Sequence, residues 1–289
     1  MMVTVASGKG GTGKTTVAAN LARICGATLL DCDVEEPNAH LFLKGEPCGE
    51  PEIVSVPVPE VDEGRCDGCG ECGRFCAYKA LVVLGRRVLV FPELCHGCGG
   101  CMRVCPKGAI RETRQRIGSV ETFRSGNMTL VQGRLDIGVA AAPPLIRAVK
   151  NHAPKDGDAL VDAPPGTACP VVTALRGTDC AVLVTEPTPF GLHDLGLAVD
   201  VVRELGLPFG VVVNRADADD CARAACRAGH IPLLAEIPDD RRIAEAYSRG
   251  ELAVEAVPEY RRVFETLMTR INGLGAKQTR ADTDGHKHE

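Results

Sequence analysis

Short apolar runs alternate with amphipathic segments along most of the chain. The chain opens with an apolar run at 2–6, a glycine-rich loop at 8–13 and a segment at 15–25 whose apolar residues recur at helical spacing. Runs that are apolar on both faces are typical of parallel strands covered by helices on both sides. The first 25 residues therefore predict a strand, a loop and a helix, in that order.

The same alternation returns in the second half of the chain. Strands are predicted at 159–161, 180–185 and 209–214, and helical segments follow the last two of them. The helices predicted in this part lie at 145–152, 190–205, 219–228, 239–249 and 259–274. Strands that alternate with helices in this way predict an α/β fold with a doubly wound, mostly parallel sheet.

The α/β pattern is interrupted after its second predicted strand, at 28–30. A proline-rich stretch that is typical of a linker comes first, and a cysteine-dense segment follows at 62–112. Two strands are then predicted within 117–135, around the turn Ser125-Gly126-Asn127. We expect an inserted domain at 58–115, an α/β domain in two parts at 1–57 and 116–275, and a disordered polar tail at 276–289.

Composition disfavours several classes of function. The 289 residues include 33 Lys and Arg against 38 Asp and Glu, and a net charge of −5 is unusual for a general nucleic-acid binder. Aromatic residues make up 3% and Trp is absent, so base-stacking surfaces are not expected. No apolar run reaches the ~18 residues of a membrane span, and the first residues lack a signal-peptide pattern. We therefore expect a cytoplasmic protein with no nucleic-acid and no membrane partner.

The loop after the first strand has the pattern of a nucleotide site. Residues 8–16 match G-x-x-x-x-G-K-[ST] between a predicted strand and a predicted helix. Backbone N–H groups of such a loop surround phosphate oxygens, while Lys14 reaches the β- and γ-phosphates and the hydroxyl of Thr15 ligates Mg²⁺. The expected nucleotide contacts are Gly8, Lys9, Gly10, Gly11, Thr12, Gly13, Lys14, Thr15 and Thr16.

Lys9 makes this loop resemble that of one family. The run Lys-Gly-Gly-x-Gly-Lys-Thr resembles the deviant Walker A motif of the MinD/ParA superfamily, which includes cell-division and chromosome-partition ATPases and the nitrogenase iron protein. The resemblance implies a P-loop NTPase fold of the SIMIBI type, an ATPase activity that depends on dimerisation, and ATP and Mg²⁺ as cofactors. It also implies that Lys9 reaches across the dimer to the ATP of the other protomer and stabilises charge there. The alternative for Lys9 is a surface lysine at the mouth of the loop.

Two aspartates at the ends of predicted strands resemble the catalytic aspartates of that superfamily. Asp33 resembles the switch I aspartate that positions the attacking water, and Asp162, in Leu-Val-Asp-Ala-Pro-Pro-Gly-Thr, resembles the Walker B carboxylate. Gly166 then resembles the switch II glycine that turns an N–H toward the γ-phosphate. Asn214 resembles the asparagine that contacts adenine, with a turn role as its alternative. The implied catalytic residues are Lys9, Lys14, Asp33 and Asp162, and the implied Mg²⁺ site is Thr15, Asp33 and Asp162.

Cysteine is the unusual component of the chain. Eight of the 15 cysteines form two C-x2-C-x2-C-x3-C runs, and the second run is followed by Pro106. Thiolates select iron–sulfur clusters, and this spacing sends three cysteines of a run to one [4Fe–4S] cube and the fourth to the other. Cluster one is expected on Cys66, Cys69, Cys72 and Cys105, and cluster two on Cys95, Cys98, Cys101 and Cys76. The alternative, tetrahedral zinc, explains two interleaved runs poorly.

Cys169 is the cysteine outside these runs that could have a function. It follows Asp162 by seven residues, the offset at which the nitrogenase iron protein has a cluster-bridging cysteine. A second matching cysteine is not evident in the sequence. A packing or switch role is therefore the alternative to a metal role.

The two cysteine runs resemble a bacterial two-cluster ferredoxin, an α+β module, and the whole chain resembles MinD-superfamily ATPases with an inserted ferredoxin domain, which are related to Mrp-type ATPases. The leading hypothesis is an ATPase whose nucleotide state gates electron transfer through two [4Fe–4S] clusters. The second is a carrier or assembly ATPase for iron–sulfur or other metal clusters, although no C-x-x-C pair follows residue 105. The third is a MinD/ParA-like positioning switch, although the tail has no basic amphipathic helix. Expected partners are a second copy or a paralogue across the ATP site, and a redox or metal-cluster protein.

Overall fold

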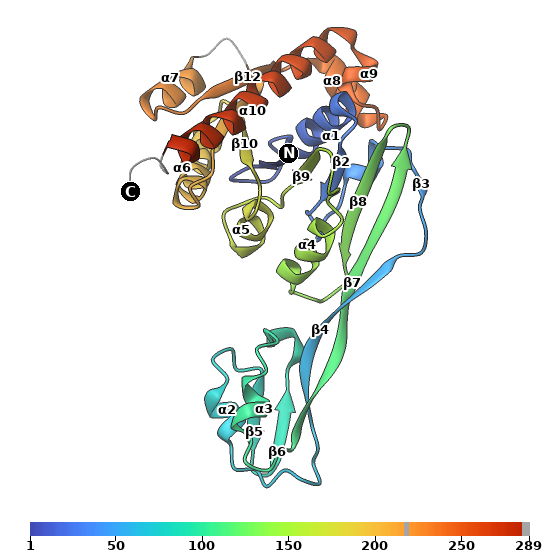
Figure 1. Ribbon diagram of the computed structural model, residues 1–289, viewed down its shortest axis with the longest axis vertical. Coiled ribbons are helices and arrows are strands. Elements are labelled where there is room, and N and C mark those ends of the chain that lie inside the picture. Colours follow the sequence, from blue (N-terminus) through green and yellow to red (C-terminus); the bar gives the residue numbers. More distant parts are fainter. Residues whose placement is uncertain (217–219, 285–289) are drawn as a thin grey trace. The chain divides into compact units, whose positions relative to one another are not determined.

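The computed structural model describes residues 1–216 and 220–284, and its side chains as far as residue 274. The chain divides into two compact units (Figure 1). Unit 1 comprises Met1–Pro51, Val120–Arg134 and Ile146–Glu289, and unit 2 comprises Glu52–Ser119 and Leu135–Leu145. The predicted inserted domain, 58–115, lies within the first segment of unit 2.

Unit 1 is built on a mostly parallel sheet. In sheet order its strands are β12 (Leu233–Pro238), β11 (Phe209–Ala216), β10 (Cys180–Thr185), β1 (Met2–Ala6), β9 (Ala159–Asp162), β2 (Thr28–Asp31), β8 (Met128–Leu135), β7 (Ile110–Ser125) and β3 (Glu46–Pro47). Neighbouring strands from β12 to β8 are parallel, whereas β3 is antiparallel to β7. The predicted mostly parallel α/β sheet is therefore confirmed.

Helices cover both faces of this sheet. Val3 and Val5 of β1 belong to the main core, together with apolar residues of α1 (Lys14–Cys25) and α10 (Pro258–Asp284). Thr4, which points to the other face because strand side chains alternate, donates a hydrogen bond to a carbonyl of α5 (Cys169–Leu175). The remaining helices of this part are η1 (Ala39–Leu41), α4 (Ala142–Lys150), α6 (Pro189–Glu204), α7 (Cys221–Ala228), α8 (Arg241–Ser248) and α9 (Ala253–Ala256).

The carboxyl ends of the central strands meet at one edge of the sheet. Asp162, the last residue of β9, lies opposite Val5 of β1 and opposite Asp31 of β2. The loop that follows β1 leads directly into α1. In open parallel sheets this edge is where ligands bind, so the topology brings the phosphate loop and the strand-end aspartates to one place.

The proline-rich stretch forms a strand where the sequence predicts a linker. β4 (Glu52–Val61) pairs with β7 and lies off the main path of the sheet. Pro57 and Pro59 fit such an edge strand because a proline there loses no hydrogen bond to a second neighbour. The prediction of a linker at this position was wrong because proline disfavours central strands more than edge strands.

The last helix is longer than the sequence predicts. α10 runs from Pro258 to Asp284, ten residues beyond the predicted end at 274, so the described part of the predicted tail is helical. Residues 285–289 of that tail lie outside the described residues. None of the helices in the described parts of the chain is long and apolar enough to cross a bilayer.

Unit 2 contains both cysteine runs. A two-stranded antiparallel sheet, β5 (Leu81–Leu84) and β6 (Arg87–Val90), precedes the short helix η2 (Pro92–Leu94). Two five-residue helices, α2 (Glu71–Phe75) and α3 (Gly100–Val104), contact each other, and each begins inside one cysteine run. The residues before these helices, Gly70 and Gly99, have φ of 82° and 68°, a conformation that glycine adopts without strain.

Candidate functional site

The phosphate loop is held closely by its surroundings. A Cβ on Gly8 would lie 2.1 Å from the carbonyl oxygen of Asp194 in α6, and a Cβ on Gly13 would lie 2.3 Å from the side-chain nitrogen of Asn214. Gly13 also has φ of 88° and precedes the first turn of α1. These two positions admit only glycine, because any side chain would displace backbone or a neighbouring amide.

Lys14 is surrounded by the two predicted catalytic aspartates. Its ammonium nitrogen lies 2.8 Å from Asp33 Oδ2 and 3.9 Å from Asp162 Oδ1, and its side chain is 9% exposed. Burial opposes the charged amine, but the carboxylates of Asp162 and Asp33 outweigh it and raise the pKa of Lys14. Lys14 is therefore a fixed cation at the carboxyl edge of the sheet, where a phosphate would meet it.

The side chain of Asp162 is fully buried, and its carboxylate lacks hydrogen-bond donors of good geometry in the part of the chain that the structure describes. Among the described residues neither of its carboxylate oxygens has a hydrogen-bond partner, although Lys14 lies close by. Burial raises the pKa of the Asp162 carboxyl, whereas the charge of Lys14 and the neighbouring Thr15 hydroxyl, which lies outside hydrogen-bond geometry, act in the opposite direction. A buried carboxylate without donors costs free energy, so this position suits a hydrated cation held together with the Thr15 hydroxyl. The residues predicted for Mg²⁺ fit that group.

Asp31 is a further buried carboxylate that is not among the predicted site residues. It accepts hydrogen bonds of 3.1 Å from the backbone N–H groups of Asp33 and Ala39. Burial, followed by the charge of Asp162, raises the pKa of Asp31 well above its usual range. Asp31 thus fixes the loop that carries Asp33. The segment Asp31-Cys32-Asp33 has two aspartates at the end of a predicted strand, but the sequence does not tell which of them faces inward.

One cavity collects most of the predicted nucleotide residues. It has a volume of about 420 Å³, and Asp33 and Asn214 line it with much of the phosphate loop. The loop residues in its wall are Gly10, Gly11, Gly13, Lys14, Thr15 and Thr16. Asn214 donates a 2.8 Å hydrogen bond to the carbonyl of Thr12, so its side chain ties β11 to the loop. Gly8, Lys9, Thr12, Asp162 and Gly166 are not part of this wall.

Two of these residues are engaged elsewhere. The N–H of Gly166 donates to the carbonyl of Ser7 at 2.9 Å, so the role predicted for it requires that bond to open. Gly166 has φ of 97°, which gives this loop the conformational freedom of glycine. Lys9 forms an ion pair with Glu186 at 3.3 Å. Glu186, at 8% exposure, is a second residue outside the predicted set, and only the tertiary fold brings it to Lys9.

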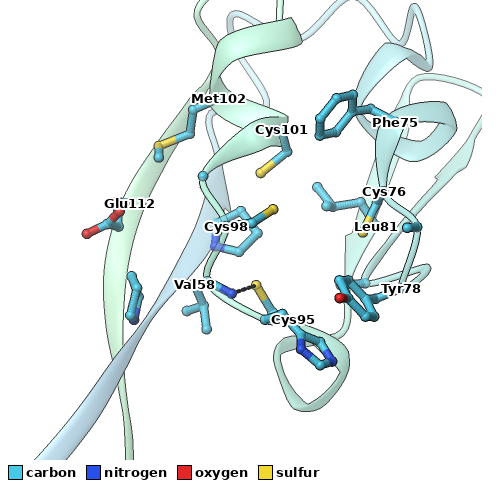
Figure 2. A pocket seen from close by; sticks show the side chains of 17 residues that line it. Val58, Phe75, Cys76, Tyr78, Leu81, Cys95, Cys98, Cys101, Met102 and Glu112 are labelled. Atoms are coloured by element: carbon cyan, nitrogen blue, oxygen red, sulfur yellow. Dashed lines mark hydrogen bonds between the residues drawn. The ribbon is translucent and has the colours of Figure 1, made fainter. Parts of the chain in front are cut away.

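The four cysteines predicted for cluster two line a single cavity in unit 2. The cavity has a volume of about 170 Å³ and is otherwise mainly apolar. Figure 2 shows Cys76, Cys95, Cys98 and Cys101 around this space, with Phe75 and Tyr78 on one side and Met102 on the other. The backbone N–H of Gly97 donates to the sulfur of Cys95 at 3.4 Å. The four thiols come from both cysteine runs, as the spacing predicts.

The four cysteines predicted for cluster one line another, narrower cavity of about 10 Å³ in the same unit. Cys66, Cys69, Cys72 and Cys105 share its wall with the apolar side chains of Val61, Val88 and Ile110. The backbone N–H of Ala109 donates to the sulfur of Cys105 at 3.3 Å. Asp67 and Lys107, which pair at 3.8 Å, also line this cavity.

Each of these two sets of four thiols lines a cavity and is not gathered around a single point. Within residues 1–216 and 220–284 no three His, Cys, Asp or Glu side chains are grouped so that they could hold one metal ion. A [4Fe–4S] cube takes one thiolate on each of its four irons, so its ligands enclose a space the size of the cube. The cavity of about 170 Å³, with four thiols in a mainly apolar wall, fits that ligand arrangement. The cavity of about 10 Å³ also brings four thiols together, but the space between them is smaller than a cube.

Cys169 belongs to unit 1 and lines neither of the two cysteine cavities of unit 2. It is exposed at the start of α5 and lines an open cavity of unit 1 with Arg147 and Arg176. No other cysteine lines this cavity among the described residues.

Comparison with known proteins shows which family this chain resembles. Residues 3–254 match the family model "CobQ/CobB/MinD/ParA nucleotide binding domain". An uncharacterised protein of Methanocaldococcus jannaschii is 32% identical over 87% of this chain and 90% of its own length. The iron–sulfur cluster carrier protein of Pyrococcus abyssi is 25% identical over 73% of this chain and 60% of its own length. The cell division ATPase MinD of Pyrococcus furiosus has a similar structure, with a TM-score of 0.58 at 24% identity over 94% of this chain and 98% of that one.

Proposed function

The chain belongs to the CobQ/CobB/MinD/ParA family of nucleotide-binding proteins, and on that premise we propose that it is an iron–sulfur protein whose Mg·ATPase cycle serves the carriage or assembly of iron–sulfur clusters. The observation that carries this proposal is that each of two cavities in unit 2 is lined by four thiols. A phosphate loop with two buried aspartates in unit 1 supplies the ATPase part.

In the nucleotide site each residue has a definable task. Lys14 gives up Asp33 as its partner and binds the β- and γ-phosphates, while the loop N–H groups surround their oxygens. Thr15 and Asp162 hold Mg²⁺, which neutralises charge on the phosphates when it is bound. Asp33, once released from Lys14, is free to accept a hydrogen bond from the attacking water and to contribute to the Mg²⁺ site.

Asn214 and Lys9 are two further residues that we assign to nucleotide contacts. Asn214 lines the cavity near the end of β11, and we assign the contact with the base to its side chain. Lys9 acts on the nucleotide of a second protomer, so the competent ATPase is a dimer with another copy or a paralogue. Gly166, at φ of 97°, turns its N–H from Ser7 to the γ-phosphate.

In unit 2 the eight cysteines provide four thiolates for each of two [4Fe–4S] clusters, whose chemistry is to hold or exchange iron and electrons. Gly97 and Ala109 donate backbone N–H groups to the thiolates of Cys95 and Cys105. Such bonds delocalise charge from sulfur and stabilise the bound form.

Carriage or assembly is favoured over electron transfer by the relatives, one of which is named as an iron–sulfur cluster carrier. ATP-gated electron transfer is the second candidate. It is favoured by the completeness of the ligand sets, since a cube with a thiolate on every iron has no open iron for exchange. The two candidates share the same cofactors and differ in whether iron leaves the chain.

The experiment that separates them follows labelled iron. The chain is reconstituted anaerobically with ⁵⁵Fe and sulfide, and an apo-ferredoxin is added as acceptor with Mg·ATP or with a non-hydrolysable analogue. Transfer of label that requires hydrolysis supports carriage. Retention of label, with a nucleotide-dependent change in the EPR signal of the reduced clusters, supports gated electron transfer. A folded chain that takes up no iron contradicts both.

A further inference from the structure

Three charged side chains, Lys9, Glu186 and Arg215, meet at the carboxyl edge of the sheet. Arg215 lines the nucleotide cavity, whereas Lys9 and Glu186 do not. Glu186 follows β10, Arg215 belongs to the end of β11, and Lys9 lies in the loop after β1. Lys9 Nζ is 3.3 Å from Glu186 Oε2, and Arg215 donates a hydrogen bond to Glu186 Oε1. Each oxygen of one carboxylate is therefore paired with a different cation.

The three side chains differ in how deeply they lie. The side chain of Glu186 is 11% exposed, whereas those of Lys9 and Arg215 are 31% and 58% exposed. A carboxylate at that depth is costly without a cation, but a second cation on its other oxygen removes most of that cost. Lys9 can leave Glu186 without exposing an unpaired buried charge, because Arg215 remains.

The backbone on both sides of this cluster is fixed. The hydroxyl of Ser7 donates to the carbonyl of Lys9 at 2.7 Å, and Gly8 is packed against Asp194. Arg215 has φ of 52°, a left-handed conformation that costs a non-glycine residue free energy. The backbone that carries Lys9 and Arg215 is thus held in place, and Lys9 can leave Glu186 by a change in its side-chain rotamers alone.

We propose that Glu186 is a positioning residue that retains Lys9 on its own protomer, and that Arg215 keeps Glu186 neutralised when Lys9 leaves. The inference rests on the proposed function, in which Lys9 serves the nucleotide of a second protomer. Dimer formation then competes with the Lys9–Glu186 ion pair. Glu186 sets how much dimer forms at a given protein concentration without touching nucleotide.

The retention of Lys9 is tested first without reference to dimers. The nucleotide-free chain is acetylated briefly, and the modification of Lys9 is measured by mass spectrometry relative to the exposed Lys155. E186Q should raise the relative rate at Lys9 by about fivefold, the order of effect of a partly exposed ion pair. E251Q, which removes another carboxylate paired with an arginine, is the matched control and should leave the rate at Lys9 unchanged.

The effect on assembly is tested by sedimentation at saturating non-hydrolysable Mg·ATP analogue. E186Q should lower the protein concentration at half-dimerisation by about fivefold, because free Lys9 has no competing partner. R215Q should raise that concentration, because Lys9 alone then neutralises Glu186 and is held more tightly. A merely structural role would move both variants in the same direction. With Lys9→Ala in the background, E186Q should have no further effect.

Unchanged acetylation of Lys9 in E186Q would overturn the proposal. A half-dimerisation concentration of E186Q equal to that of the wild-type chain would also overturn it. So would a shift of this concentration in the same direction in E186Q and R215Q. If the wild-type chain and E186Q bind the analogue but both stay monomeric, the dimer of the proposed function is refuted. The acetylation result then still decides whether Glu186 retains Lys9.

Discussion

Asp33 accepts a 2.8 Å hydrogen bond from the ammonium group of Lys14, so two residues predicted to act on ATP are paired with each other. In the proposed function, the phosphate groups of a nucleotide take the place of Asp33 as the partner of Lys14. The same step frees Asp33 for water. The pairing therefore links the arrival of phosphate to the release of the aspartate predicted to position the nucleophile.

Replacing Lys14 should remove nucleotide binding and also destabilise the nucleotide-free chain. In Lys14→Ala the buried Asp162 loses its nearest cation, and breaking such a pair costs about 3 kcal/mol in the free energy of unfolding. Urea denaturation and binding of a fluorescent ATP analogue measure the two effects. Lys14→Ala combined with Asp162→Asn should regain part of the lost stability but none of the binding. Equal stability of the single and double variants would contradict the role given to this pair.

Asp162 should control the response to Mg²⁺ more than the affinity for nucleotide alone. Asp162→Asn removes the buried carboxylate that lacks donors, so added Mg²⁺ should no longer tighten ATP binding and hydrolysis should fall by at least about 100-fold. Calorimetric titration of ATP with and without Mg²⁺ measures the difference. A variant that keeps the full Mg²⁺ effect would show that the metal is held elsewhere.

Gly8 should tolerate no side chain. In Gly8→Ala the new methyl group would meet the backbone of Asp194, and we expect a loss of about 2 kcal/mol in unfolding free energy and weaker ATP binding. Gly196→Ala, in the helix α6 that also carries Asp194, is the control, because no described atom outside its immediate backbone lies within 4 Å of the added Cβ. That control should gain up to about 1 kcal/mol from helix propensity. If both variants lose stability alike, the close approach at Gly8 is not the cause.

Tyr260 should titrate at unusually high pH. Burial, and then the hydrogen bond that its hydroxyl donates to Asp240 at 2.9 Å, raise the pKa of Tyr260 to about 12. The fold favours the neutral phenol, so the stability from this bond is present below the ordinary pKa of about 10 and is lost as pH rises through 12. Tyrosinate absorbance should show this ionisation in the wild-type chain and in Tyr247→Phe, but not in Tyr260→Phe. Loss of the signal in both variants would contradict the assignment.

Local sequence was sufficient for the phosphate loop and for the alternation of most strands and helices in unit 1, because both follow from spacing within one or two elements. It did not predict β12, α5 or α9. Local sequence also paired the cysteines in the sets that line the two cavities, since the spacing of a run limits which thiols can meet. Features set by tertiary packing escaped it. Glu186 reaches Lys9 only because β10 lies beside β1 in the sheet, and Asp31 is distinguished from Asp33 only by burial. The sequence did not predict β4, because prolines that are typical of a linker are also tolerated in an edge strand.

The iron content of single-cysteine variants measures the central proposal most directly. After anaerobic reconstitution the wild-type chain should hold about eight irons and eight acid-labile sulfides. Cys69→Ser and Cys98→Ser should each lose about four irons from a different cluster, with distinct changes in the EPR spectrum of the reduced protein, while the control Cys48→Ser should lose none. A folded wild-type chain that binds ATP but no iron, or a single zinc ion that depends on these cysteines, would contradict the account.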